Sequence, residues 1–168
     1  MTDSPETAEA QQSLVIERRY KARVEDLWAL WTTRDGFESW WGPDGFRVEV
    51  HALEARAGGA LSYDMIADAP EAIAAMKQMG QPLSHGTRGW FEELVPNQWL
   101  VLMHSVDFVP GMDPYDSRID VSFAQIGEES LMVVTLHPHR DPMWTQMSAQ
   151  GFTSQLGKLD RCYGWSPD

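Results

Sequence analysis

The sequence predicts an α+β fold with a mainly antiparallel sheet. Three observations support this prediction: a strand pattern is followed by two short helical patterns, the middle of the chain alternates with a period of two, and one long helical pattern comes last. Runs of strands followed by a helix are typical of this class. We expect residues 1–11 to be a flexible tail and residues 12–168 to form one domain.

The first predicted elements are a strand and two helices. Residues 13–21 alternate in polarity, as a strand does. Over residues 24–33 apolar side chains recur every three or four positions, with Glu25 and Asp26 in the first turn, where carboxylates suit the helix dipole. A second short helix is predicted over 36–41, because Gly42 and Pro43 end it.

The central part of the chain predicts about six strands. Turns are expected at Gly58-Gly59, at Pro96-Asn97 and around Gly127. Alternation places Tyr63 and Met65 on one face, and it points His104 into the interior. The predicted strands are 46–54, the segment from Leu61 to Met65, 87–95, 98–108, 118–126 and 130–137.

The last helix is the most clearly defined element. Asp141 suits the N-cap and Pro142 suits the first turn. Gly151 and Gly157 each cost about 1 kcal/mol relative to Ala in a helix interior, so we expect another backbone, or something held against the helix, to approach them closely. The predicted apolar stripe consists of Trp144, Met147, Phe152, Leu156 and Leu159.

Two segments interrupt the strands. Residues 68–81 have helical spacing and form either a surface helix or a lid over a cavity. Residues 109–116 contain two prolines and are interpreted as a structural crossover, whose Tyr115 could border an opening.

Composition limits the function. Thirteen Lys and Arg against 25 Asp and Glu give a net charge of −12, which makes nucleic acid an unfavourable partner. No apolar run approaches the roughly 20 residues of a membrane helix, and the start lacks a signal-peptide pattern. The single Cys162 fits a reducing compartment, so we expect a cytoplasmic protein. Eight Trp and nine Met indicate either a bulky core or a core that encloses an apolar cavity.

The sequence contains no catalytic motif that we can identify. A phosphate loop, a nucleophile elbow and a zinc-protease helix motif are all missing, so no catalytic residue and no cofactor is predicted. His137 and His139 are expected in an exposed turn, and no metal site is predicted there because no spaced ligand motif supports one. His104 is either a satisfied core histidine or a ligand contact.

Residues 27–46, LWALWTTRDGFESWWGPDGF, carry a resemblance to a known family. Together with Gly58-Gly59, with Gly151-Phe152 and with the following QLGKL, they resemble the Aha-type branch of the START-like, or SRPBCC, superfamily. That branch is named after activators of the ninety-kilodalton heat-shock chaperone's ATPase. The resemblance covers residues 13 to about 161. It implies a helix-grip fold, as in the birch pollen allergen: a curved antiparallel sheet around the C-terminal helix, with an interior cavity.

The resemblance leaves the function open, because this fold serves carriers, sensors, cyclases and chaperone cofactors. Our leading hypothesis is binding of a hydrophobic small molecule, lipid-like or aromatic, by a monomer or weak homodimer. The alternatives are a cyclase- or hydrolase-type enzyme that uses His104 and Tyr115, and a module that interacts with a chaperone or another protein. The candidate ligand-binding residues are Trp41, Tyr63, Met65, His104, Phe108, Tyr115, Phe123, Trp144 and Phe152.

Overall fold

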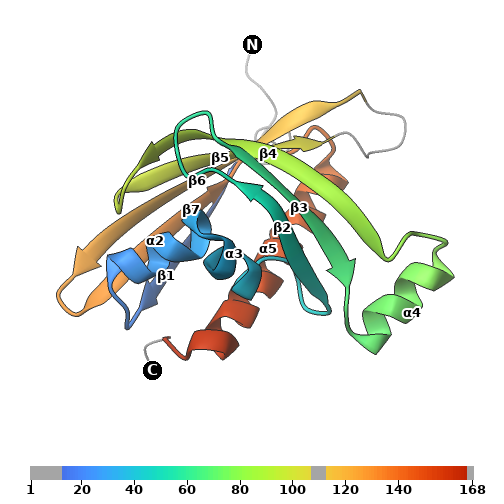
Figure 1. Cartoon of the computed structure of the whole chain (residues 1–168), viewed down its shortest axis with the longest axis horizontal. Helices are drawn as coiled ribbons and strands as arrows, with labels where there is room; N and C mark the ends of the chain where they lie inside the picture. Colours follow the sequence, from blue (N-terminus) through green and yellow to red (C-terminus); the bar gives the residue numbers. More distant parts are fainter. Residues whose placement is uncertain (1–12, 107–112, 166–168) are drawn as a thin grey trace, which may run out of the picture.

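The computed structural model describes residues 13–106 and 113–165, which form a seven-stranded sheet curved around a long C-terminal helix (Figure 1). The strands are β1 (Leu14–Tyr20), β2 (Phe46–Leu53), β3 (Ala60–Ala67), β4 (Ser84–Val95), β5 (Trp99–Val106), β6 (Tyr115–Ile126) and β7 (Glu129–Leu136). The helices are α2 (Val24–Thr32), α3 (Arg34–Trp40), α4 (Pro70–Gln78) and α5 (Pro142–Tyr163). All neighbouring strands are antiparallel, in the order β1-β7-β6-β5-β4-β3-β2. The predicted helix-grip fold is confirmed.

Side-chain alternation determines which face of the sheet is buried. On β3, Leu61 and Tyr63 are buried on the concave face, which contacts the helices. Ser62 and Asp64 lie between them in sequence and therefore point to the outer face. The predicted faces of β3 are confirmed by this register, in which Tyr63 pairs with Val50 of β2 and with Thr87 of β4.

The main core lies where α2 and α3 meet the sheet and the second half of α5 (Figure 1). Trp31, Phe37 and Trp40 have no exposed surface. The rings of Trp31 and Trp40 meet edge to face with centroids 5.0 Å apart, a favoured aromatic geometry. Burial of each such side chain contributes about 2–3 kcal/mol. Tryptophan therefore fills this half of the interior.

Helix α3 also contacts the free edge of the sheet. Among the described strands, β2 has only β3 as a neighbour, so its other side is unpaired there. The carboxylate of Glu38, on α3, accepts a hydrogen bond from the backbone N–H of Val50 at 2.7 Å. A β-bulge follows directly, between Val50 and Ala52. The bond therefore holds α3 against the edge at the point where strand pairing becomes irregular.

Helix α5 begins as predicted, after the N-cap Asp141, but its buried face is different. Phe152, Leu156 and Leu159 are buried, whereas Met147 is 50% exposed. Five residues separate Met147 from Phe152, which places them about 140° apart around the helix. The prediction for Met147 was therefore wrong, and Gln155, only 4% exposed, lies in the buried stripe instead.

The two glycines of α5 are not sites of close backbone approach. Among the described residues, a Cβ atom added at Gly151 would meet nothing within 4 Å, and one at Gly157 would meet only the Arg161 side chain, at 3.6 Å. The expectation of a tightly packed neighbouring backbone is therefore wrong at both positions. Within residues 13–106 and 113–165, the space beside Gly151 is open.

Two segments differ in detail from the expectation. Strand β6 begins at Tyr115, earlier than the predicted residue 118, so Tyr115 belongs to the sheet and not to a crossover loop. Helix α4 has no buried residue and projects from the end of the sheet (Figure 1). Its start is fixed by hydrogen bonds from the N–H groups of Asp68 and Ala69 to the carbonyl of Gly45. Both the surface-helix and the lid interpretation of residues 68–81 stay predictions.

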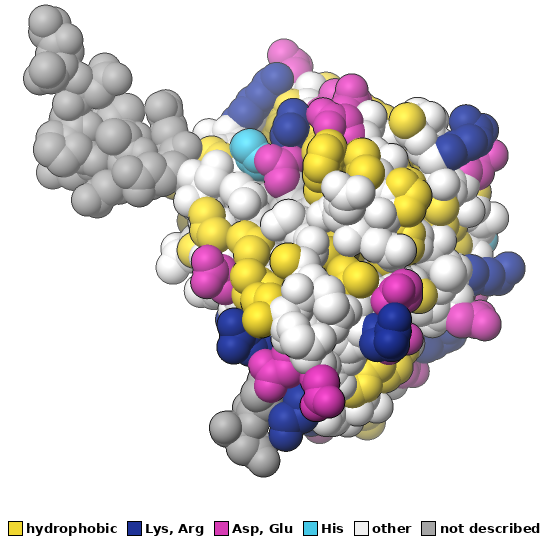
Figure 2. Space-filling model, turned by 90° about the vertical axis from the view of Figure 1, so that its left-hand side faces the viewer, with side chains coloured by type: hydrophobic (Ala, Val, Ile, Leu, Met, Phe, Trp, Pro, Cys, Tyr) yellow, Lys and Arg dark blue, Asp and Glu magenta, His cyan; other side chains and the backbone are white. Residues whose placement is uncertain are grey.

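Several arginines of the described surface lie next to opposite charges. The side shown in Figure 2 carries hydrophobic patches with acidic and basic groups close together around them. Arg19, Arg23 and Arg118 each lie within 4 Å of a carboxylate, so these cations are compensated by neighbouring anions. Within the described ranges, no helix is long and apolar enough to span a membrane.

Candidate functional site

Three of the predicted site residues form one buried hydrogen-bond network. Trp41 follows α3 directly, Tyr63 lies on β3 and His104 lies on β5. The indole Nε1–H of Trp41 donates to the Tyr63 hydroxyl at 2.9 Å, and that hydroxyl lies 3.0 Å from Nε2 of His104. The Trp41 and His104 rings are nearly parallel, with centroids 6.0 Å apart. The sheet and α3 thus bring together side chains that are far apart in sequence.

The network is uncharged near neutral pH. Burial, with a smaller contribution from the charge of His139, lowers the pKa of His104 from 6.5 to about 4. Burial also raises the pKa of Tyr63 far above its usual value, although hydrogen bonds from Trp41 and Thr87 oppose that change. Neutral polar groups in an apolar surrounding orient a ligand without demanding a charge on it.

Phe152 and the indole of Trp41 belong to the main core. The Phe152 ring lies 6.2 Å from that of Trp31 and 6.0 Å from those of Trp40 and Trp41. These four rings fill the space between α5 and the α2–α3 unit. Phe152 is therefore a packing residue whose 5% exposed surface leaves little for a ligand to contact.

Tyr115 and Trp144 lie together in a second, smaller apolar cluster with Val106. The Tyr115 hydroxyl is 2.6 Å from Nδ1 of His139, and the guanidinium of Arg140 lies 5.0 Å from the Tyr115 ring centroid. Burial lowers the pKa of His139 below its usual value. His104 bonds to Tyr63 and Tyr115 bonds to His139, so the two residues of the enzyme hypothesis do not share a hydrogen-bond partner.

Phe123 does not lie with Tyr115, although both are on β6. Eight residues separate them, about 26 Å along an extended strand. Phe123 packs edge to face on Trp28 of α2, with ring centroids 5.6 Å apart. It is a core residue at the opposite end of the strand. Phe108, which the sequence places in the predicted strand 98–108, lies outside the described residues.

The concave face is partly open to solvent where β3 ends and β4 begins. Met65 pairs with His85, and Tyr63 pairs with Thr87, so all four side chains point to the same side of the sheet. Tyr63 is buried, Met65 and Thr87 are half-buried, and His85 is exposed. Burial thus decreases along the concave face toward this end of the strands.

Sequence reasoning missed three polar residues of this region, Thr87, His139 and Gln155. The amide oxygen of Gln155 accepts a hydrogen bond from the backbone N–H of Gly42 at 3.0 Å. Thr87 could have been found from strand alternation, since it lies opposite Tyr63. Gln155 could not, because a glutamine beside an apolar stripe is normally solvated.

His137 and His139 do not form a joint site. Nε2 of His137 lies 3.0 Å from a carboxylate oxygen of Asp120 on the outer face, while His139 bonds to Tyr115. Over residues 13–106 and 113–165 no group of three His, Cys, Asp or Glu side chains is placed to hold a metal ion. Cys162 is exposed, and its thiol lies 3.7 Å from the carbonyl of Ser39.

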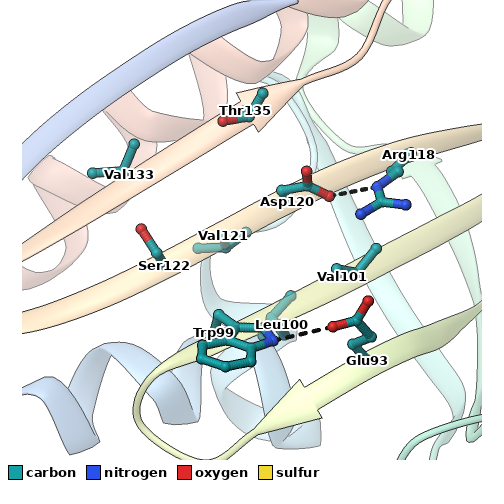
Figure 3. Close-up of a pocket in the computed structure, with 10 residues that line it drawn as sticks. All are labelled: Glu93, Trp99, Leu100, Val101, Arg118, Asp120, Val121, Ser122, Val133 and Thr135. Carbon is teal, nitrogen blue, oxygen red and sulfur yellow. Dashed lines mark hydrogen bonds and ion pairs between the residues drawn. The ribbon is translucent and has the colours of Figure 1, made fainter.

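The outer face of the sheet has a shallow hollow of about 230 Å³ (Figure 3). Trp99 forms one side of it, and its indole N–H donates to Glu93 at 3.3 Å. The guanidinium of Arg118 donates to Asp120 at 2.7 Å on another side. Val101 and Val133 also line the hollow. An apolar floor with polar sides suits a protein contact better than an enclosed ligand.

The sequence matches the family model described as "Activator of Hsp90 ATPase homolog 1-like protein" over residues 21–164. The chain belongs to this family. Membership of this family, AHSA1 for short, confirms the resemblance to the Aha-type branch. It supports a ligand-binding or interaction domain in general without naming a ligand. No curated protein matches the chain.

Solved structures share the AHSA1 fold with this chain. A protein from Chromobacterium violaceum is 23% identical, with a TM-score of 0.70 over 94% of this chain and 99% of its own. The AHSA1 protein from Silicibacter pomeroyi is 18% identical, with a TM-score of 0.68 over 88% and 94%. A protein from Arthrobacter aurescens is 20% identical, with a TM-score of 0.68 over 91% and 86%. At these identities the similarity shows the fold alone.

Proposed function

We propose that the protein binds a small, mainly apolar molecule between the first half of α5 and the concave faces of β3, β4 and β5. The decisive observation is that Met65, His85 and Thr87 keep solvent exposure on the face where Tyr63 is buried. Side chains on the concave face of a sheet that faces a helix are normally covered. Their exposure supports an accessible binding surface at this end of the domain.

The division of the apolar interior supports the same location. Leu102 of β5 belongs to the main core, whereas Val106 belongs to the second cluster with Tyr115. His104 lies between Leu102 and Val106 on the same face of the strand. The polar network is therefore situated where the two apolar clusters are not joined, with apolar walls on both sides.

Helix α5 contributes the other wall. Gly151 has open space where a side chain would begin, and it lies one turn before the buried Gln155. A glycine weakens a helix interior by about 1 kcal/mol, so its presence here has a stability cost. Room for a ligand beside the helix accounts for that cost.

The proposal is tested by closing this space. We expect Gly151→Leu to weaken binding of Nile red, followed by its fluorescence, at least tenfold, because the new side chain occupies the open volume. Gly157→Leu is the matched control: it makes the same change on the same helix, but the added Cβ meets only Arg161. Native mass spectrometry of freshly purified protein would show whether a copurified compound is lost in the same variant. Equal binding by both variants would contradict this location.

A second candidate function is protein interaction through the outer face. Trp99 is 43% exposed beside the hollow lined by Val101 and Val133. Exposed tryptophan is enriched at interfaces. Since the family description names activation of the Hsp90 ATPase, an ATPase assay with this chaperone tests this candidate. Stimulation by the wild type that is lost in Trp99→Ala and kept in Gly151→Leu would favour it over ligand binding.

A further inference from the structure

Three buried side-chain atoms of the described residues have no hydrogen-bond partner: the hydroxyl of Tyr20, Oδ1 of Asp160 and Nε2 of Gln155. Tyr20 and Asp160 influence each other electrostatically, and one is a donor while the other is an acceptor. A buried donor and acceptor that lie close together can share one bridging water molecule. Gln155 has no complementary atom of this kind, so its donor is the one that requires another explanation.

The orientation of the Gln155 amide is fixed by its neighbour. The N–H of Gly42 can only donate, so the atom 3.0 Å from it is the amide oxygen, and the NH₂ group faces elsewhere. Side chains on a helix lean toward its N-terminus, which directs Gln155 over the preceding turn. That turn contains Gly151, beside which the space is open. The unpaired donor and the open space therefore lie on the same stretch of α5.

The unpaired NH₂ group of Gln155 makes the folded protein without a ligand less stable. Leaving a buried donor without an acceptor costs about 1–3 kcal/mol, which an incoming acceptor recovers. Gln155 is 4% exposed, so bulk water does not reach this group freely. On the side of the amide oxygen, Gly42 lies against Val48, which pairs with Met65 on β3.

We infer that the ligand is a neutral, mainly apolar molecule with one hydrogen-bond acceptor, such as a ketone or ether oxygen, that accepts from Nε2 of Gln155. This inference rests on the proposed ligand site. A neutral acceptor suits this place better than an anion, because the ammonium of Lys158 already directs two of its three N–H groups to the carbonyls of Trp41 and Phe46, at 3.2 and 2.9 Å. The electrostatic influence of Asp44 and Asp68 on Lys158 compensates its charge further.

Three naphthalene probes of similar size test the inference: 2-acetylnaphthalene has a neutral acceptor, 2-ethylnaphthalene has none, and 2-naphthoate is an anion. Their affinities are measured with the wild type, with Gln155→Met and with Gln150→Met. Gln150 is exposed on the same helix, so the control makes the same substitution away from the site. We expect the affinity of the ketone relative to the ethyl compound to fall about five- to tenfold in Gln155→Met only.

The outcomes separate this inference from the proposed function. Binding of both neutral probes with an unchanged affinity ratio in Gln155→Met would overturn the donor role but leave the binding site intact. Tightest binding of 2-naphthoate would overturn the neutral class. Failure of all three probes to bind the wild type would overturn the proposed function itself. If Gln155→Met does not fold, Gln155→Glu at pH 8 removes the donor and keeps an oxygen for Gly42.

Discussion

Trp41 and His104 lie face to face, 6.0 Å apart with their planes at 13°, and both are within hydrogen-bond distance of the Tyr63 hydroxyl. The contact joins the end of α3 to the middle of the sheet. It places a titratable ring inside an apolar interior, where its ionisation is coupled to the stability of the whole domain.

The stability of the protein should fall as the pH drops below 6.5. Burial, followed by the charge of His139, lowers the pKa of His104 to about 4 in the folded state, so between these values only the unfolded chain takes up the proton. The stabilisation present above pH 6.5 is lost through this window, by about 3 kcal/mol. Urea unfolding at pH 7.5 and 4.5 checks this. His104→Gln should lose clearly less stability over the same range, and an equal loss would contradict the assignment.

Removal of the Tyr63 hydroxyl should destabilise the fold by about 1–3 kcal/mol. Tyr63→Phe leaves the indole N–H of Trp41 and the ring of His104 without their partner in a buried place. Tyr163→Phe is the matched control, since its hydroxyl bonds to Ser39 and is only half-buried. Chemical unfolding at pH 7.5 measures both, and a smaller effect at Tyr63 than at Tyr163 would be inconsistent with the network.

Truncation of Phe152 should cost about 3–5 kcal/mol. Phe152→Ala removes a ring that contacts Trp31, Trp40 and Trp41 and leaves a cavity among rigid indoles. Thr153→Ala, at the next and exposed position of α5, should change the unfolding free energy by less than about 0.5 kcal/mol. Thermal or urea unfolding compares the two variants. A cost near 1 kcal/mol for Phe152→Ala would mean that this part of the interior is loosely packed.

Two glycine substitutions should act in opposite directions. A Cβ at Gly59 would lie 2.0 Å from the carbonyl oxygen of Glu54, so Gly59→Ala is expected to destabilise by at least about 2 kcal/mol. Gly157→Ala places a methyl in ordinary contact on α5 and should stabilise by up to about 1 kcal/mol. Midpoints of thermal unfolding give the sign of each change. No loss of stability in Gly59→Ala would show that the turn adapts, and destabilisation by Gly157→Ala would contradict the ordinary contact expected on α5.

Elements whose pattern is local were predicted well, because the spacing of apolar residues along the sequence differs between strands and helices. The faces of β3 and the start of α5 at Asp141 follow from alternation and from capping, and both are confirmed. Tyr115 was misplaced because Pro114 indicates a loop, although a proline directly before a strand does not interrupt its ladder.

The candidate site was less predictable, because its members meet only through the tertiary fold. Strand alternation predicted the faces on which Tyr63 and His104 lie. The hydrogen bond between them depends on the order of the strands in space. The buried position of Gln155 depends on the contact with Gly42, more than a hundred residues earlier in the chain. Whether the nine predicted residues bind a ligand stays a prediction.

The bond between Glu38 and the N–H of Val50 affects how copies of the protein meet at high concentration. An unpaired edge strand offers its backbone groups to strands of other molecules, which is a route to aggregation. Here the carboxylate of Glu38, which also forms an ion pair with Arg34 at 3.5 Å, already occupies one of those donors. An approaching strand must displace an anion before it can pair. The contact that holds α3 against β2 thereby also opposes strand pairing between the sheets of neighbouring molecules.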